Sequence, residues 1–308
     1  METWLLLTFL GAFLQNIRSF LQRRITDNLS INGSSFVRFL FAIPLAFAVV
    51  LLLVDRIPSL PWTFLWYVMA GGIAQIVGTS CLISAVVKGN FSVGTTLSKT
   101  EAAQAALFGL VVLGDAITVS IALGILVSLA GVACLSWSGG SFLPNLSRQA
   151  LILGLISGTG FAVAAVCFRG ASLSLEFGEF FERAALTVLV AVTLQSIILG
   201  IYLLVREPGE LSRVFQNWRV SSVIGCVGML ASLCWFSAMT LNSAAVVRAV
   251  GQIELLFSIL ASTVLFKEKI TLRELFGIFT IMLSAVSYTH LRAHETKANL
   301  VCRLLLEK

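Results

Sequence analysis

Long apolar runs, separated by short polar stretches, make up almost the whole chain. The runs are too long and too continuous to alternate as β-strands do, and each is close to the roughly 17–25 residues that a helix needs to cross a bilayer core. The pattern therefore predicts an all-α polytopic membrane protein with about ten transmembrane helices. We expect these spans at about 4–21, 34–54, 63–87, 91–113, 117–137, 150–170, 180–205, 220–241, 244–266 and 271–288.

Landmark residues of the first half recur in the second half at a constant offset. Glu101 in the fourth span returns as Glu254 in the ninth, and Gly124 returns as Gly277, each 153 positions further on (101 to 254, 124 to 277). Five spans per copy is an odd number, so the second copy has to enter the membrane in the opposite sense. We therefore expect two inverted five-helix repeats with a site at the midplane between them.

The repeats set the domain boundaries. We place the first repeat at 1–137, a linker at 138–149 and the second repeat at 150–286. The last stretch, 287–308, holds both histidines of the chain and is polar in texture, and its opening resembles translated sequencing adaptor. We interpret 287–308 as a non-native tail, the alternative being a basic tail that contacts anionic lipid.

Composition supports a membrane protein and excludes several chemistries. Hydrophobic residues make up 58% of the chain and charged residues 12%, with a mean hydropathy of +0.97, far from the roughly 25% charge of soluble domains. The first apolar run lacks a cleavage site and is expected to remain as a span. The six cysteines lie singly, and no histidine precedes the tail. We predict no enzyme, no cofactor, no metal site and no nucleic-acid partner.

Two carboxylates lie where a membrane protein rarely keeps a charge. Glu101 and Glu254 each lie about ten residues inside an apolar helix, roughly 15 Å deep. A charge at that depth costs roughly 2.5–3.5 kcal/mol on insertion scales, and membrane charges tend to pair. Lys99 and Arg248 are near in sequence, and we expect Glu101 to pair with Arg248 or Glu254 with Lys99 across a cavity. We expect these carboxylates to exchange a proton or to bind a cationic group of the substrate. The alternative is a structural ion pair that holds the two halves together.

Other polar and aromatic side chains within the spans are candidates for the same site. Arg18 either meets an anionic substrate group or extends its side chain to the membrane surface. Gln75 and Trp235 either supply a hydrogen bond and an aromatic wall to a cavity or pack between helices. The predicted substrate- or proton-binding set is Glu101, Glu254, Lys99, Arg248, Gln104, Gln252, Gln75, Trp235 and Arg18.

Several features together resemble the drug/metabolite transporter superfamily, EamA type. They are the five-helix repeats, Arg38 and Arg183 near the starts of spans two and seven, the corner Leu113-Gly-Asp115, and the corner Phe266-Lys-Glu-Lys-Ile-Thr271. The resemblance covers residues 1–286. It implies a ten-helix basket whose central cavity is lined largely by spans 1, 3, 4, 6, 8 and 9 and which exports small metabolites or amphiphiles. Such repeats commonly carry proline where this chain has Glu101 and Glu254, so the resemblance does not explain the carboxylates.

These observations predict a secondary transporter that works by alternating access. We expect a multi-pass protein of the cell inner membrane or plasma membrane that exports a small metabolite, amino acid or amphiphilic compound by proton antiport. Its partners are then a small-molecule substrate, the lipid bilayer and protons. The alternatives are an uncoupled or uptake carrier of the same fold, or a non-transporting membrane scaffold subunit. The distribution of Lys and Arg over the loops places the N-terminus outside, whereas the resemblance implies an N-terminus inside.

Overall fold

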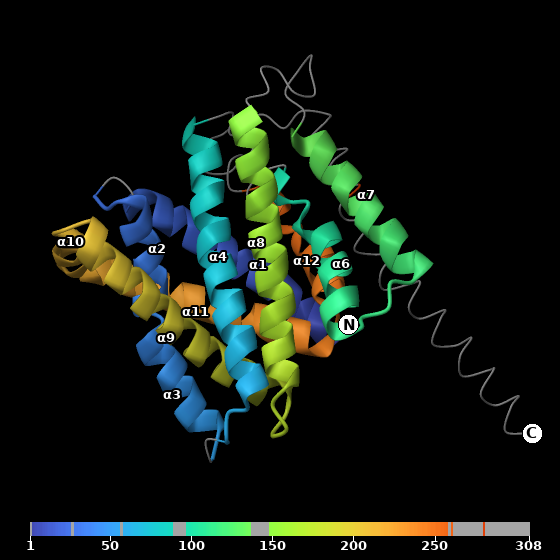
Figure 1. Ribbon diagram of the computed structural model, residues 1–308, viewed down its shortest axis with the longest axis horizontal. Coiled ribbons are helices and arrows are strands. Elements are labelled where there is room, and N and C mark those ends of the chain that lie inside the picture. The colour runs from blue at the N-terminus through green and yellow to red at the C-terminus, as the bar shows by residue number, and fades with distance from the viewer. Residues whose placement is uncertain are drawn as a thin grey trace, which may run out of the picture.

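The computed structural model of the chain describes residues 2–25, 28–55, 58–88, 97–136, 148–257, 260 and 280. Within these residues the secondary structure is helical, without strands (Figure 1). The predicted tenth span, 271–288, is described only at Thr280, and the tail 287–308 lies outside the described residues. The helices are α1 (Thr3–Ile25), α2 (Ile31–Leu40), α3 (Ile43–Leu53), α4 (Trp62–Lys88), α6 (Glu101–Leu113), α7 (Val119–Ser136), α8 (Arg148–Leu173), α9 (Phe180–Arg206), α10 (Glu210–Gln216), α11 (Trp218–Leu241) and α12 (Ala244–Gly251).

Six stretches of the described chain are long and apolar enough to cross a membrane, and the shorter α6 is also apolar. Large apolar side chains on the outside of the bundle stay uncovered, among them Leu52, Trp62 and Val111, which are 84%, 78% and 81% exposed. Such a surface suits lipid and not water, since soluble proteins keep their exposed apolar patches small. The protein is an all-α, multi-pass membrane protein, as predicted. The six stretches are Thr3–Gln22, Ile31–Leu53, Trp62–Ala85, Ile152–Leu173, Phe180–Arg206 and Trp218–Leu241.

The second predicted span is interrupted. It consists of α2 and α3, with Phe41 and Ala42 between them and Pro44 in the first turn of α3. Proline has no N–H to donate to the preceding turn, so it favours a new helix start. At the interruption the backbone of Phe41 lies against Gly225 of α11, where an added Cβ would come within 2.4 Å of the Phe41 carbonyl carbon. The continuous helix expected over 34–54 is therefore corrected to two segments.

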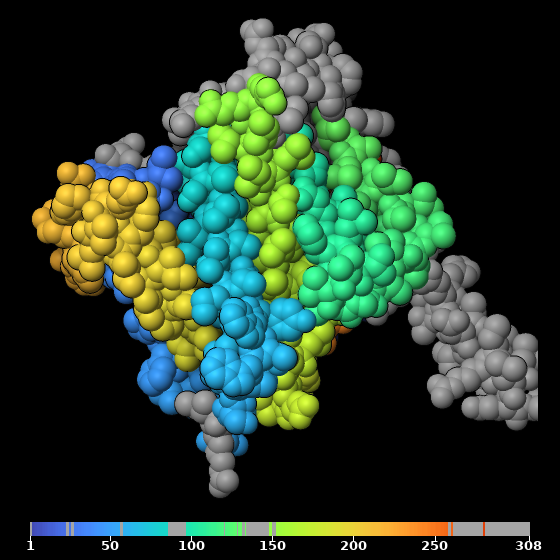
Figure 2. Space-filling view, in the orientation of Figure 1, coloured from blue at the N-terminus to red at the C-terminus, as the bar shows by residue number. Residues whose placement is uncertain are grey.

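Helix contacts between the two halves occur in matching pairs. Span three (α4) packs on span six (α8), and span one (α1) packs on span eight (α11). Exchanging the two repeats turns one pair into the other. The contact of α4 with α8, visible along the front face in Figures 1 and 2, brings backbones together at Gly78 and Gly160. An added Cβ at Gly160 would lie 2.7 Å from the carbonyl oxygen of Ala74, so this close approach requires glycine.

Spans four and nine are broken at equivalent places. A turn at Lys99 and Thr100 precedes α6, and a turn at Gln252 and Ile253 follows α12, after which residues 254–257 are helical again. At both turns the backbone hydrogen bonds reach back three residues instead of four: Thr100 N–H to Leu97, and Gln252 N–H to Ala249. Both expected continuous helices therefore have a break inside the membrane. Each break places a glutamate at the start of the helical segment that follows, where the helix dipole favours negative charge.

Candidate functional site

A cavity of about 550 Å³ opens between the two repeats. Its wall comes from α1, α2, α4 and α8 and from both broken helices. The resemblance implied walls from spans 1, 3, 4, 6, 8 and 9. Among the lining residues, span two (α2) takes part and span eight (α11) does not, because α11 packs behind α1 and α2. The lining residues are Gln15, Asn16, Arg18, Ser19, Gln22, Ile31, Ser34, Arg38, Gln75, Thr79, Leu82, Ile83, Ser98, Lys99, Glu101, Phe161, Arg248, Glu254 and Leu255.

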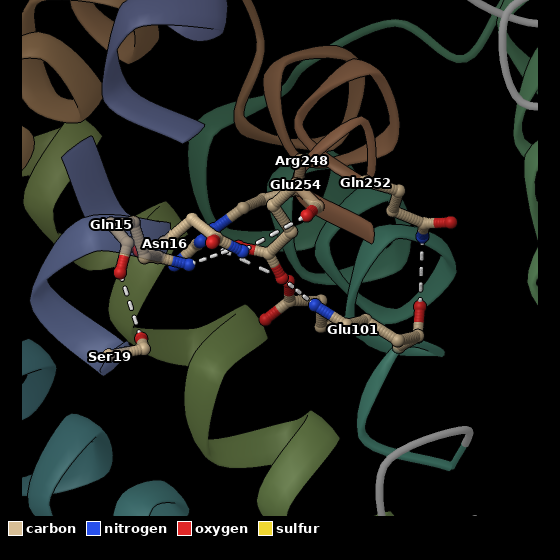
Figure 3. A network of polar contacts seen from close by, with 8 residues as sticks. Gln15, Asn16, Ser19, Glu101, Arg248, Gln252 and Glu254 are labelled. Atoms are coloured by element: carbon tan, nitrogen blue, oxygen red, sulfur yellow. Dashed lines mark hydrogen bonds and ion pairs between the residues drawn. The ribbon is translucent and has the colours of Figure 1, made fainter. Parts of the chain in front are cut away.

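Glu254 is the centre of a polar network on one side of the cavity (Figure 3). The Lys99 ammonium, from the break in the other repeat, forms an ion pair with one carboxylate oxygen of Glu254. The other oxygen accepts a hydrogen bond from the side-chain amide of Gln15 on α1. Asn16 donates to the backbone carbonyl of Glu254 at 3.3 Å. The carboxylate thus joins α1 and both broken helices.

Glu101 pairs with Arg248, and this contact is looser. Its Oε1 lies 3.8 Å from Nη1 of Arg248, beyond hydrogen-bond distance. The side chains are only 10% and 12% exposed, so the pair is shielded from bulk water. The guanidinium of Arg248 also lies over the ring of Trp235, 5.0 Å from its centroid, which adds a cation–π contact. Both of the cross-repeat pairs expected from the sequence, Glu101 with Arg248 and Glu254 with Lys99, are present in the structure.

The two breaks touch directly. The side-chain amide of Gln252 donates to the backbone carbonyl of Lys99 at 3.1 Å (Figure 3). Positions 99 and 252 are equivalent in the two repeats, so this contact lies where an axis relating the repeats would pass. A carbonyl freed by the helix break thereby gains a partner inside the membrane, as buried backbone groups require.

Two further arginines reach the cavity. Arg18 of α1 and Arg38 of α2 both line it. Among the described residues neither has a carboxylate within ion-pair distance, and Nε of Arg18 is buried without a hydrogen-bond partner. Arg38 lies over the ring of Phe39, 4.4 Å from its centroid. The expected span 34–54 placed Arg38 near a helix start, but α2 begins at Ile31, so Arg38 lies in the last turn of α2 and its side chain lines the cavity.

Six of the nine predicted site residues lie in the cavity wall: Glu101, Glu254, Lys99, Arg248, Gln75 and Arg18. The other three lie beside it. Gln104 accepts a hydrogen bond from Thr159 of α8 at 2.6 Å and so ties α6 to α8. Gln252 is buried between the breaks, and Trp235 is buried against Gly251 and beneath Arg248. These three side chains support the wall and do not form it.

A polar face of α1 contributes several lining residues that the prediction missed. Gln15, Ser19 and Gln22 line the cavity together with Arg18. Their positions, 15, 18, 19 and 22, follow the spacing of one helix face. This polar stripe in an otherwise apolar span is a pattern from which the sequence could have predicted a cavity-facing side of the helix. Within the described part of the chain, no group of His, Cys, Asp and Glu is placed to hold a metal ion.

The fold and the cavity define a class of protein: a helical membrane protein with a site between two repeats that polar and charged side chains line. Sequence comparison names the family. The profile of the EamA-like transporter family matches residues 2–137 and 148–289, and the chain belongs to this family of membrane transporters. The two matched segments correspond to the two repeats.

Structural comparison supports the same fold. A solved structure titled "Crystal structure of protein" matches with a TM-score of 0.70 and 16% sequence identity, over 94% of this chain and 97% of that chain. At this identity the likeness establishes the fold alone. No curated protein matches the sequence.

Proposed function

We propose that the protein is a secondary transporter that exports a small organic solute by alternating access, in the cell inner membrane or plasma membrane. The observation that supports this most strongly is the cavity with its two cross-repeat ion pairs. Five spans per repeat favour an inverted arrangement, in which each half can tilt against the other around a fixed central site. Transport then needs two states with different contacts between the halves.

The ion pairs provide such a difference in contacts. Lys99 with Glu254, and Arg248 with Glu101, each join one broken helix to the other. A protonated carboxyl no longer attracts the cation, so taking up a proton weakens the contact between the repeats. Proton uptake by a carboxylate and tight closure of this part of the cavity therefore exclude each other. This exclusion is the physical basis for coupling the movement of a proton to the movement of a solute.

Reconstitution in proteoliposomes with a trapped pH-sensitive dye tests the proposal. Wild-type protein is exposed in turn to monocarboxylates, phosphate esters, amino acids, nucleosides and amphiphilic cations. We expect at least one solute to produce a proton flux. The variants Glu101→Gln and Glu254→Gln, which cannot take up the proton, should lose this flux while remaining folded by size-exclusion chromatography and circular dichroism.

A matched control is available outside the cavity. Asp115 pairs with Arg169 of α8 at 3.0 Å, joining helices as the central pairs do without lining the cavity. Asp115→Asn should therefore keep the flux within about twofold of wild type. Solute movement with unchanged pH dependence in both glutamine variants would overturn the coupling role. If folded wild-type protein moves none of the solutes, transport itself is refuted and a scaffold function is favoured.

A further inference from the structure

The charges around the cavity are unequal. Among the described residues, four cationic side chains line it, Arg18, Arg38, Lys99 and Arg248, against the two carboxylates Glu101 and Glu254. Both carboxylates are already paired, with Arg248 and Lys99. The described part of the wall therefore carries an excess of two positive charges. Inside a membrane such an excess is costly unless an opposite charge is bound.

The packing of α1 and α2 against α11 brings Arg18 and Arg38 to neighbouring places. At Gly228 of α11 an added Cβ would lie 3.1 Å from Cδ of Arg18 and 3.9 Å from the backbone carbonyl of Arg38. Both residues therefore pack against the same point of α11. Gln22 of α1 donates to the carbonyl of Ser34 at 3.0 Å, which fixes the end of α1 to the start of α2. Two helices that contact each other and α11 thus carry the two arginines.

Within the described part of the chain, the guanidinium groups of Arg18 and Arg38 have no carboxylate within ion-pair distance, and they meet repulsion from neighbouring cations. Arg18 repels Arg248, and Arg38 repels both of them. Nε of Arg18 is buried and has no hydrogen-bond partner. The Phe39 ring beneath Arg38 contributes a cation–π contact of at most about 2 kcal/mol, which does not neutralise the charge. An anion placed among these groups would accept a hydrogen bond from Nε of Arg18 and remove the repulsion.

We propose that the transported solute is a small organic anion whose carboxylate or phosphate group binds between Arg18 and Arg38. The inference rests on the proposed transport function and specifies its substrate class. Guanidinium groups present paired N–H donors that match the oxygens of a carboxylate or phosphate. A purely cationic solute would meet two uncompensated positive charges here, and a neutral one would leave them unpaired.

Binding to purified wild-type protein in detergent tests this without requiring transport. The probes are pyruvate, succinate, glycerol 3-phosphate and inorganic phosphate, with glycerol as the neutral and tetraphenylphosphonium as the cationic comparison. Thermal shift and isothermal titration report the binding. We expect saturable binding of at least one organic anion, and the comparison of succinate with glycerol 3-phosphate distinguishes a carboxylate site from a phosphate site.

Variants locate the bound group. Arg18→Gln and Arg38→Gln should each weaken anion binding roughly tenfold or more, because each removes a charged hydrogen-bond donor. Arg18→Lys and Arg38→Lys keep the charge but lose the paired donors and should give intermediate affinities; they also serve where a glutamine variant does not fold. Arg213→Gln, at a guanidinium that is 62% exposed and outside the cavity, is the control and should bind as wild type does.

The outcomes separate the two proposals. Anion binding that all four cavity variants leave unchanged overturns the inference, and so does binding of glycerol or tetraphenylphosphonium without binding of any anion. Failure of every anion to bind folded wild-type protein overturns it as well. Anion binding that depends on the arginines, combined with no flux in proteoliposomes, would support the site and refute transport.

Discussion

At the scale of residues, the carboxylates are duplicated but their cations are not. Glu101 and Glu254 occupy equivalent positions, whereas Lys99 has Gln252 as its counterpart and Arg248 has Thr95. One cation in each repeat therefore pairs with the carboxylate of the other repeat. The result is two unlike pairs: Glu254 has Lys99 and Gln15 as donors, whereas Glu101 lies 3.8 Å from Arg248.

A double-mutant cycle measures how strongly the tighter pair couples the repeats. Lys99→Met leaves the Glu254 carboxylate without its cation, and Glu254→Met leaves the ammonium without its anion. Each single variant should lose roughly 1–3 kcal/mol of stability, because an uncompensated polar group remains in a mostly buried site. The double variant leaves neither charge and should be more stable than the sum of the single effects predicts. Thermal unfolding of the four proteins in one detergent gives the comparison; strictly additive losses would show that the two side chains do not interact.

At the scale of elements, two glycines set the distance between α4 and α8. The Cβ of any other residue at position 160 would meet the carbonyl of Ala74 at 2.7 Å and the backbone of Gly78 at 2.8 Å. Backbone atoms of packed helices cannot move aside as a flexible side chain can. Since α4 and α8 both line the cavity, through residues such as Gln75 and Phe161, this contact also determines the shape of the site.

Gly160→Ala should therefore destabilise the protein by roughly 1–3 kcal/mol, the usual cost of overpacking. Gly72→Ala on α4 is the matched control. Its added Cβ would meet Cγ of Gln195 at 3.4 Å, an ordinary van der Waals distance, so its melting temperature should stay close to that of the wild type. Fluorescence-detected size-exclusion chromatography after heating ranks the three proteins. Equal stability of both alanine variants would contradict the close contact.

At the scale of the whole molecule, the pairing of α4 with α8 and of α1 with α11 fits two repeats that exchange places about an axis. With five spans each, such repeats are expected to run in opposite senses through the membrane. The loop between spans two and three, at Asp55 and Ser59, then faces the side opposite to the loop between spans seven and eight, at Pro208. All three residues are exposed and therefore accessible to a label.

Single cysteines in a cysteine-free background test this arrangement. In sealed vesicles a membrane-impermeant maleimide should modify Asp55→Cys and Ser59→Cys to the same extent, since both lie in one loop. Pro208→Cys should be protected from the maleimide where Asp55→Cys and Ser59→Cys are modified, and modified where they are protected. Permeabilised vesicles should label all three. Equal labelling of Ser59→Cys and Pro208→Cys from one side would contradict the inverted repeat. The side on which Asp55 is labelled would also decide between the N-terminus outside and the N-terminus inside.

The sequence by itself determined the class of the protein and the chemistry of its centre. Bilayer thickness fixes the length of an apolar run, and a buried charge needs a partner, so the spans, the duplicated glutamates and their cross-repeat cations follow from residue types and spacing.

The tertiary structure alone decided which polar groups lie in the same cavity. Gln104 and Trp235 were as plausible as Gln75 from sequence, yet only Gln75 lies in the wall, because the wall depends on how each helix is rotated against its neighbours. The breaks before Glu101 and Glu254 contain no proline and form where the two helices meet. The placement of Arg38 in the cavity likewise results from the packing of α2 and α3 against α11, a long-range contact that no local pattern encodes.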